Sequence, residues 1–205
     1  MKWSEVFEPG LSTDELFLKR LPAMQQTRQQ EFREFSSATI ILSVLFEDVD
    51  QRYTLTFDRD GLEVIDEEAI DFPVASARGK LSDWQRALPW IQELVIPADA
   101  QVARYRGKVH LTPEMIEHFE RFDGVFQVEV TDLPDGRPLS FSIVLNDYEA
   151  PEDARVVRAS VSWPLLQDVA HGRVDPVQGA RQLSIAGEVG LALEIGAFIM
   201  RELGL

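Results

Sequence analysis

The chain of 205 residues contains no cysteine. This absence excludes disulfides, thiolate catalysis, iron–sulfur clusters and the commonest structural zinc sites. Positive charge is also scarce, with 20 Lys and Arg residues against 35 Asp and Glu residues. The resulting net charge of −15 repels phosphate backbones and anionic lipid surfaces, because both recruit proteins through basic clusters. We therefore expect no nucleic-acid partner.

Long hydrophobic runs are missing as well. No charge-free stretch reaches the roughly 18 apolar residues that a membrane-spanning helix needs. The first residues, Met1 to Glu5, lack the basic start and the apolar core of a signal peptide. The hydrophobic content of 45% is nevertheless enough to build a core. We expect a soluble, cytoplasmic globular protein without integral membrane association.

Motifs for catalysis and metal binding are equally scarce. The sequence has neither a Gly-x-Ser-x-Gly nucleophile elbow nor a Gly-rich phosphate loop. Glu114 and His118 stand four apart, which is more typical of an exposed helical pair than of a metal site. The acidic run from Asp58 to Asp71 lacks the spacing of a calcium loop. We expect no catalytic residue, metal or cofactor, although an acid–base pair inside a pocket would escape a motif search.

The order of predicted elements is similar in the two halves of the chain. Each half predicts alternating strands joined by polar turns, then a helix, a short strand and a further helix. The predicted strands lie at 38–47, 52–57, 62–65, 107–111, 125–130, 139–145, 156–161 and 183–185. This order predicts an α+β fold with one or two antiparallel sheets and helices on one face. Duplication, with halves at 1–112 and 113–205, is one explanation, and chance repetition of a common order is the other.

The last predicted helix, from Glu188 to Leu203, is unusual because it is apolar on most of its faces. A surface helix usually carries an apolar stripe on about a third of its circumference. We therefore expect this helix to be buried on two sides. Gly190 and Gly196 each cost roughly 1 kcal/mol in a helix relative to Ala, so we expect close approach or flexibility at these positions.

A set of short motifs precedes and enters this helix. Gly172 ends one predicted helix, Asp175-Pro176 begins another, and a Leu-x-Ile-x-Gly strand follows, leading to Leu191-Ala192. This segment resembles the end of sterol carrier protein 2 domains, with Gln182 standing where those domains usually have Gly. The resemblance covers about residues 111–205 and, more faintly, residues 16–111.

The resemblance implies a function. Domains of this family enclose a hydrophobic tunnel that takes sterols, fatty acyl chains or other lipids. It implies non-catalytic binding or transfer of a hydrophobic ligand here, with the last helix closing the tunnel. Trp84 and Trp163 are further aromatic candidates, since both fall at the start of a helix in their half. The expected wall consists of apolar residues from the second half: Phe126, Phe141, Ile143, Trp163, Leu166, Leu191, Ile195, Phe198 and Ile199.

A second reading of the last helix comes from another class of protein. An apolar helix exposed on the surface would mark an interaction site. The alternative function is therefore a structural or dimerising protein, with a homodimer as its form and only a vestigial pocket.

Overall fold

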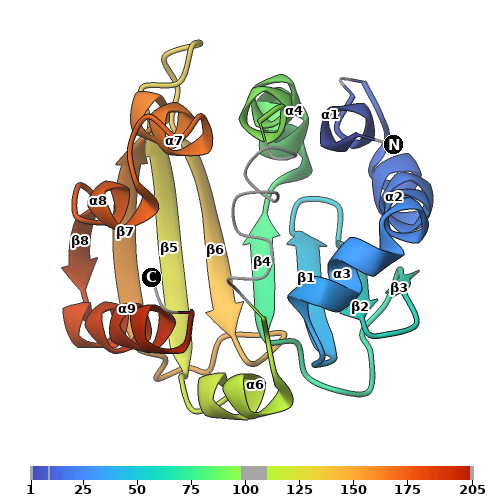
Figure 1. Ribbon diagram of the computed structural model, residues 1–205. Helices are drawn as coiled ribbons and strands as arrows, with labels where there is room; N and C mark the ends of the chain where they lie inside the picture. Colours follow the sequence, from blue (N-terminus) through green and yellow to red (C-terminus); the bar gives the residue numbers. More distant parts are fainter. Residues whose placement is uncertain (1, 9, 98–109, 204–205) are drawn as a thin grey trace.

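A computed structural model describes residues 2–8, 10–97 and 110–203 of the chain. Its centre is one eight-stranded sheet in the order β3-β2-β1-β4-β6-β5-β7-β8 (Figure 1). The strands of the first half are β1 (Ile40–Phe46), β2 (Gln51–Phe57), β3 (Leu62–Ile65) and β4 (Ala75–Gly79). Those of the second half are β5 (Gly124–Thr131), β6 (Leu139–Leu145), β7 (Val156–Ser162) and β8 (Ser184–Gly187).

The sheet is mixed. β1 pairs with β4 in parallel and β5 with β7 in parallel, whereas the other neighbouring strands are antiparallel. The predicted α+β class is confirmed, but the sheet is not purely antiparallel. The reason lies in the connections 66–74 and 146–155, which lead to the far side of the first strand of each half, so that β4 pairs with β1 and β7 pairs with β5.

Helices cover one face of this sheet, as predicted (Figure 1). In β1, Leu42, Val44 and Phe46 point toward the helices and Ser43 points to the other face, because successive side chains of a strand alternate. None of the described helices is long and apolar enough to cross a membrane. The helices are α1 (Trp3–Val6), the π-helix η1 (Glu15–Arg20), α2 (Leu21–Thr27), α3 (Gln29–Phe35), α4 (Leu81–Val95), α6 (Pro113–Phe119), α7 (Trp163–Ala170), α8 (Pro176–Ala180) and α9 (Val189–Leu203).

The two halves share one topological unit. In the first half, β1 lies between its hairpin partner β2 and the parallel strand β4, and α4 follows β4 directly. In the second half, β5 lies between β6 and the parallel strand β7, and α7 follows β7 directly. β4 and β6 join the two units into a continuous sheet. The division into halves at 1–112 and 113–205 stays a prediction.

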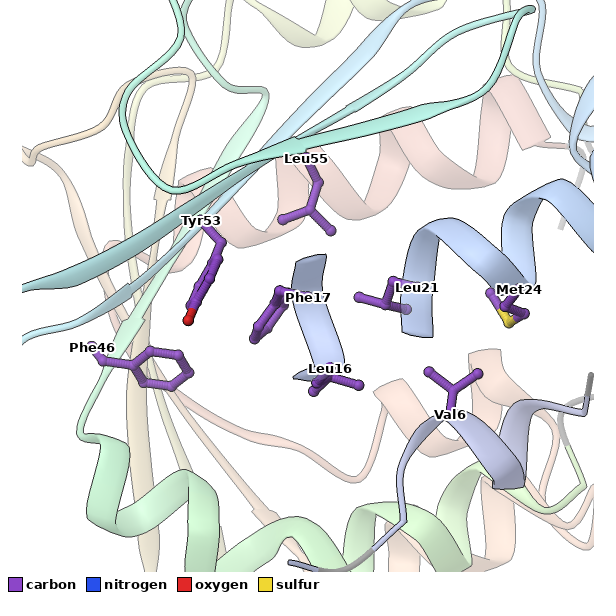
Figure 2. Close-up of a cluster of buried hydrophobic side chains, with 8 residues drawn as sticks. All are labelled: Val6, Leu16, Phe17, Leu21, Met24, Phe46, Tyr53 and Leu55. Carbon is purple, nitrogen blue, oxygen red and sulfur yellow. The ribbon is translucent and has the colours of Figure 1, made fainter. Parts of the chain in front are cut away.

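The largest apolar cluster lies between the first half of the sheet and the N-terminal helices. Figure 2 shows Phe17 of η1 beside Tyr53 of β2, and their rings stack with centroids 4.6 Å apart. Large apolar area and stacked geometry together make such a pair a strong anchor for a helix on a sheet. The buried members of this cluster are Val6, Leu16, Phe17, Leu21, Met24, Phe46, Tyr53 and Leu55.

The other face of the sheet is covered only in part. The connection 66–74 crosses the end of the sheet near β2, where the Thr54 hydroxyl donates to the Glu67 carbonyl at 2.6 Å. The hydroxyl of Tyr148 accepts a hydrogen bond from the Ala69 amide at 2.7 Å and holds the same connection. Ser43 and Ser76 are buried under this cover. The remaining part of the face, over β5 to β8, is polar and accessible.

The last helix is less enclosed than its sequence predicts. Leu191, Ile195 and Phe198 form its buried side, at helical spacing. The opposite side is exposed to solvent: Val189 to 41%, Leu193 to 68%, Ile199 to 38% and Met200 to 45%. The expectation of burial on two sides is therefore wrong, because the sheet and the segment 113–122 pack against one side of α9 and, in the described part of the chain, the other side stays in solvent.

The glycines of α9 also differ from expectation. A Cβ atom at Gly196 would meet nothing within 4 Å, and one at Gly190 would meet only the Arg155 guanidinium at 4.0 Å. Neither glycine is required for a close approach of neighbouring groups. The glycine that permits a close approach to this helix is Gly124, where a Cβ atom would lie 2.5 Å from a methyl group of Leu191.

Most local predictions agree with the structure. Thr112, Ser162 and Asp175 each accept a hydrogen bond from a backbone amide in the first turn of the following helix, and Asp175 is where the sequence predicts a helix to begin. The strand predicted at 107–111 lies almost wholly outside the described residues.

Candidate ligand-binding cavity

An apolar cavity of about 450 Å³ lies between α4 and the helix-covered face of the sheet. Its floor comes from β1, β4, β5 and β6, its roof from α4, and its two ends from η1 and α7. Both halves of the chain therefore contribute to it. The floor residues are Val44, Phe46, Ala77, Val130, Leu139 and Phe141, and the roof residues are Trp84, Ala87, Trp90, Ile91 and Leu94.

The first turn of the roof helix α4 is capped by a carboxylate from a turn at the end of the sheet. Asp48, in the β1–β2 turn, accepts hydrogen bonds from the backbone amides of Leu81 at 2.6 Å and Ser82 at 3.4 Å. The bond from Leu81 is the main reason that the pKa of the Asp48 carboxyl lies below its usual value. The cap of this helix is thus a residue distant in sequence, because the side chain of the preceding residue, Lys80, forms no capping hydrogen bond. Asp48 thereby ties the start of α4 to the end of β1.

Aromatic rings surround the cavity. The Trp84 ring lies with its centroid 6.0 Å from those of Phe17 and Phe46, at the η1 end. The Trp90 ring lies 6.5 Å from that of Trp163, at the α7 end. Flat, rigid side chains of this kind offer large apolar contact area to a ligand at a low cost in conformational entropy.

Arg86 fastens the roof to the β5–β6 turn. Its guanidinium donates to the Asp135 carboxylate at 2.9 Å and to the backbone carbonyls of Arg137 at 3.1 Å and Pro138 at 2.7 Å. Asp83, one turn earlier in α4, accepts from the same guanidinium at 3.2 Å. The Asp135 carboxylate is the largest cause of the raised pKa of Arg86. This network holds α4 at a fixed height above the floor of the cavity.

The cavity offers little for acid–base chemistry. Among the described lining residues the titratable ones are Arg78, Lys80 and Asp83, and the carboxylate of Asp83 is paired with Arg86. The histidines His110, His118 and His171 are exposed and do not line it. No group of three potential metal ligands comes together within the described part of the chain. Apolar surface dominates the lining, and such surface binds apolar groups in preference to water.

The predicted wall residues fall into two separate places. Phe141, Trp163 and Leu166 line the cavity under α4. Phe126, Ile143, Leu191 and Ile195 belong instead to a filled cluster between α9 and the sheet.

Phe198 belongs to that second place too. Its ring packs 5.8 Å from Phe119 and 5.5 Å from Phe122, whereas the neighbouring Ile199 is exposed. The predicted closure of the cavity by the last helix therefore does not hold for the cavity described above, since α4 covers it and no described residue of α9 lines it.

The sequence predicts the roof helix but not its place over the cavity. Trp84, Ala87, Ile91 and Leu94 stand at helical spacing, which indicates an apolar face over 84–94 but not the surface that this face covers. Pro89 interrupts the pattern, but it lies on the exposed side of α4. Trp84 and Trp163, singled out from the sequence, both line the cavity, and their contact with a ligand stays a prediction.

Comparisons with known proteins give similarities of fold. No family model matches the sequence, and no curated protein matches it either. The chain is similar to the solution structure of sterol carrier protein domain 2 of Helicoverpa armigera, with 20% identity, a TM-score of 0.29, and coverage of 42% of this chain and 73% of that one. It is also similar to a double mutant of the sec-alkyl sulfatase PisA1, with 12% identity and a TM-score of 0.21, covering 92% of this chain and 16% of that one.

The first similarity agrees with the resemblance predicted from the C-terminal motifs. Neither likeness carries a function to this chain.

Proposed function

We propose that this protein binds a hydrophobic small molecule, of lipid or fatty acyl type, in the cavity under α4. The observation that carries the proposal is the apolar lining of a space of about 450 Å³, which lies in the size range typical of small-molecule sites. Each methylene group moved from water into such a space contributes about 0.8 kcal/mol. An acyl chain can therefore bind tightly without a catalytic group, and the protein acts as a carrier or binding protein rather than an enzyme.

The site is built to keep its shape. Asp48 holds the start of α4, Arg86 holds its middle, and Trp90 meets Trp163 at the α7 end. A preformed cavity loses less entropy on binding than one that must be ordered by its ligand. A small loss of entropy on binding favours reversible uptake of apolar molecules.

Filling the cavity from its roof tests the proposal. Ala87 is buried and lines the cavity, so Ala87→Leu places a larger side chain in the ligand space. We expect uptake of a fluorescent fatty acid to fall by about tenfold or more, which corresponds to a loss of about 1.4 kcal/mol. Thermal unfolding of the same samples checks that the variant remains folded.

The matched control is the same substitution on α9. Ala197→Leu lies on the exposed side of that helix, outside the cavity, and should leave uptake unchanged. If Ala87→Leu remains folded and binds as well as the unmodified chain, the cavity under α4 is not the binding site. If Ala197→Leu alone abolishes binding, the last helix closes the site after all.

A second candidate function rests on the exposed apolar side of α9. Leu193 and Met200 lie there with Val189, on one side of the helix. A contiguous apolar surface of this kind is typical of an interface, here between two copies of the chain. Native mass spectrometry with organic extraction separates the two functions. Co-purified lipid supports the carrier, whereas a stable dimer without lipid, together with no fatty-acid uptake, supports the dimerising protein.

A further inference from the structure

A second hollow, of about 730 Å³, lies on the opposite face of the sheet from α4. Polar and apolar side chains share its lining, and the polar ones from the sheet stand mainly at outward-facing positions of β6, β5, β7 and β8. These include Gln127 and Glu129 of β5, Ser140 and Ser142 of β6, Arg158 and Ser160 of β7, and Ser184 of β8.

The polar hollow and the apolar cavity meet at the end of β4. Six residues line both: Arg78, Gly79, Lys80, Asp83, Ser140 and Phe141. The cause is a difference in strand length. Pairing between β4 and β6 ends at Arg78 and Ser142, whereas β6 pairs with β5 as far as Leu139. Beyond Gly79 the chain leaves the sheet and enters α4, so one side of β6 has no neighbouring strand there.

The charges at this junction are nearly all paired, with one exception. Arg78 contacts the Glu47 carboxylate at 3.1 Å, and Asp83 contacts Arg86 at 3.2 Å. Lys80 is exposed, and its ammonium group has no hydrogen-bond or ion-pair partner among the described residues.

The other two charged residues of the polar hollow, Glu129 and Arg158, do not line the apolar cavity. Glu129 and Arg158 stand on the neighbouring strands β5 and β7, at diagonal positions within reach of long side chains. Among the charged residues that line both hollows, the one whose side chain has no described partner is therefore Lys80.

Resting on the proposed function, we infer that the ligand is a single-tailed amphiphile with an anionic head. Its apolar tail lies under α4, and its head passes the end of β4 to reach Lys80 at the polar hollow. An anionic oxygen is the partner that an unpaired ammonium group binds best, through a charge-assisted hydrogen bond. The serines and Gln127 of the hollow offer further donors to the head. Lys80 thus determines which head group the site accepts.

Two probes with the same tail test this inference. Isothermal titration compares dodecanoate with dodecanol, which share the apolar chain and differ in head charge. We expect the carboxylate to bind about tenfold more tightly, and Lys80→Gln to remove that difference while leaving dodecanol binding unchanged. Lys80 is exposed, so the substitution should not disturb folding. Lys19→Gln, at a lysine outside both hollows, is the matched control and should change neither affinity.

The outcomes separate this inference from the proposed function. If both probes bind equally and Lys80→Gln changes neither affinity, the head-group inference is wrong and the carrier function stands. If neither probe binds to the unmodified chain, the carrier function fails and the inference fails with it. Loss of binding for both probes in Lys80→Gln would also contradict a role limited to the head group.

Discussion

Gly124 holds the start of β5 in a place where no side chain fits. Its φ angle of +146° is one that other residues rarely adopt, and a Cβ atom would lie 2.6 Å from the Arg155 carbonyl oxygen. We expect Gly124→Ala to lower the free energy of unfolding by roughly 1–3 kcal/mol, because both the backbone and the contact with Leu191 must shift. Urea unfolding measures this loss. An unchanged midpoint would show that β5 and α9 can separate without cost.

Gly196 should behave in the opposite way. It lies inside α9, and a Cβ atom there meets no atom within 4 Å. Gly196→Ala should therefore raise the free energy of unfolding by about 0.5–1 kcal/mol, through the lower entropy of the unfolded chain and the higher helix propensity of Ala. A thermal melt of the two proteins side by side measures the difference. A decrease would mean that a partner approaches α9 at this position.

Tyr53 gives the fold a dependence on alkaline pH. Burial, and then the hydrogen bond from its hydroxyl to Asp14, raise the pKa of Tyr53 to about 12. In the unfolded chain a tyrosine ionises near pH 10, so the unfolded state loses its proton first. Stability from this group is therefore complete below about pH 10 and falls as the pH rises from about 10 to about 12.

Tyr53→Phe checks this assignment. The variant loses the hydrogen bond to Asp14, so it should be less stable than the unmodified chain by about 1 kcal/mol below pH 10. The gap should narrow as the pH rises toward about 12, because only the unmodified chain loses stability by ionisation of this residue. Urea midpoints across this pH range measure the gap. A constant gap would show that Tyr53 ionises in the folded chain as easily as in the unfolded one.

At the scale of elements, α4 is the part on which the cavity depends. Arg86→Ala removes the hydrogen bonds to the carbonyls of Arg137 and Pro138, at about 1 kcal/mol for each bond lost. We expect a lower unfolding midpoint and weaker uptake of the fluorescent fatty acid, since the roof is no longer held over the floor. Arg86→Lys should recover little, because an ammonium group cannot reach both carbonyls and Asp135 in one plane. Unchanged uptake of the fluorescent fatty acid by Arg86→Ala would show that the aromatic contacts alone hold α4 over the cavity.

Most elements follow from short stretches of sequence. The β6 boundaries predicted at 139–145 are those of the structure, and Thr112, Ser162 and Asp175 cap the helices that follow them. Alternation and capping are local signals, so a sequence reveals them. The parallel placement of β4 and β7 depends on the path of long connections, which carries no local signal.

The candidate site could be predicted only in part, for the same reason. Phe141, Trp163 and Leu166 were named from their apolar character and do line the cavity. Phe17 of η1 and Ala87 of α4 line it too, but nothing in the sequence places them opposite Trp163. The apolar composition of α9 drew attention to a helix whose inner side is ordinary core and whose outer side is exposed. The composition of a helix predicts how apolar its surface is, but the packing of the whole sheet determines which side of the helix is buried.

At the scale of the whole molecule, one sheet carries two different surfaces. The helix-covered face supplies the apolar cavity, and the accessible face supplies the polar hollow that meets it at the end of β4. The net charge of −15 keeps copies of the chain apart in solution at low salt. An association through α9 would therefore strengthen with added salt, because screening removes the repulsion while apolar contact remains.

Quenching of tryptophan fluorescence by a brominated acyl chain tests the central claim most directly. Trp84, Trp90 and Trp163 line the cavity, so a bromine atom on a bound tail lies beside them. We predict saturable quenching by terminally brominated dodecanoate in the unmodified chain and in Ala197→Leu, and its loss in folded Ala87→Leu. Absence of saturable quenching in the unmodified chain, or equal quenching in Ala87→Leu, would contradict a ligand site under α4.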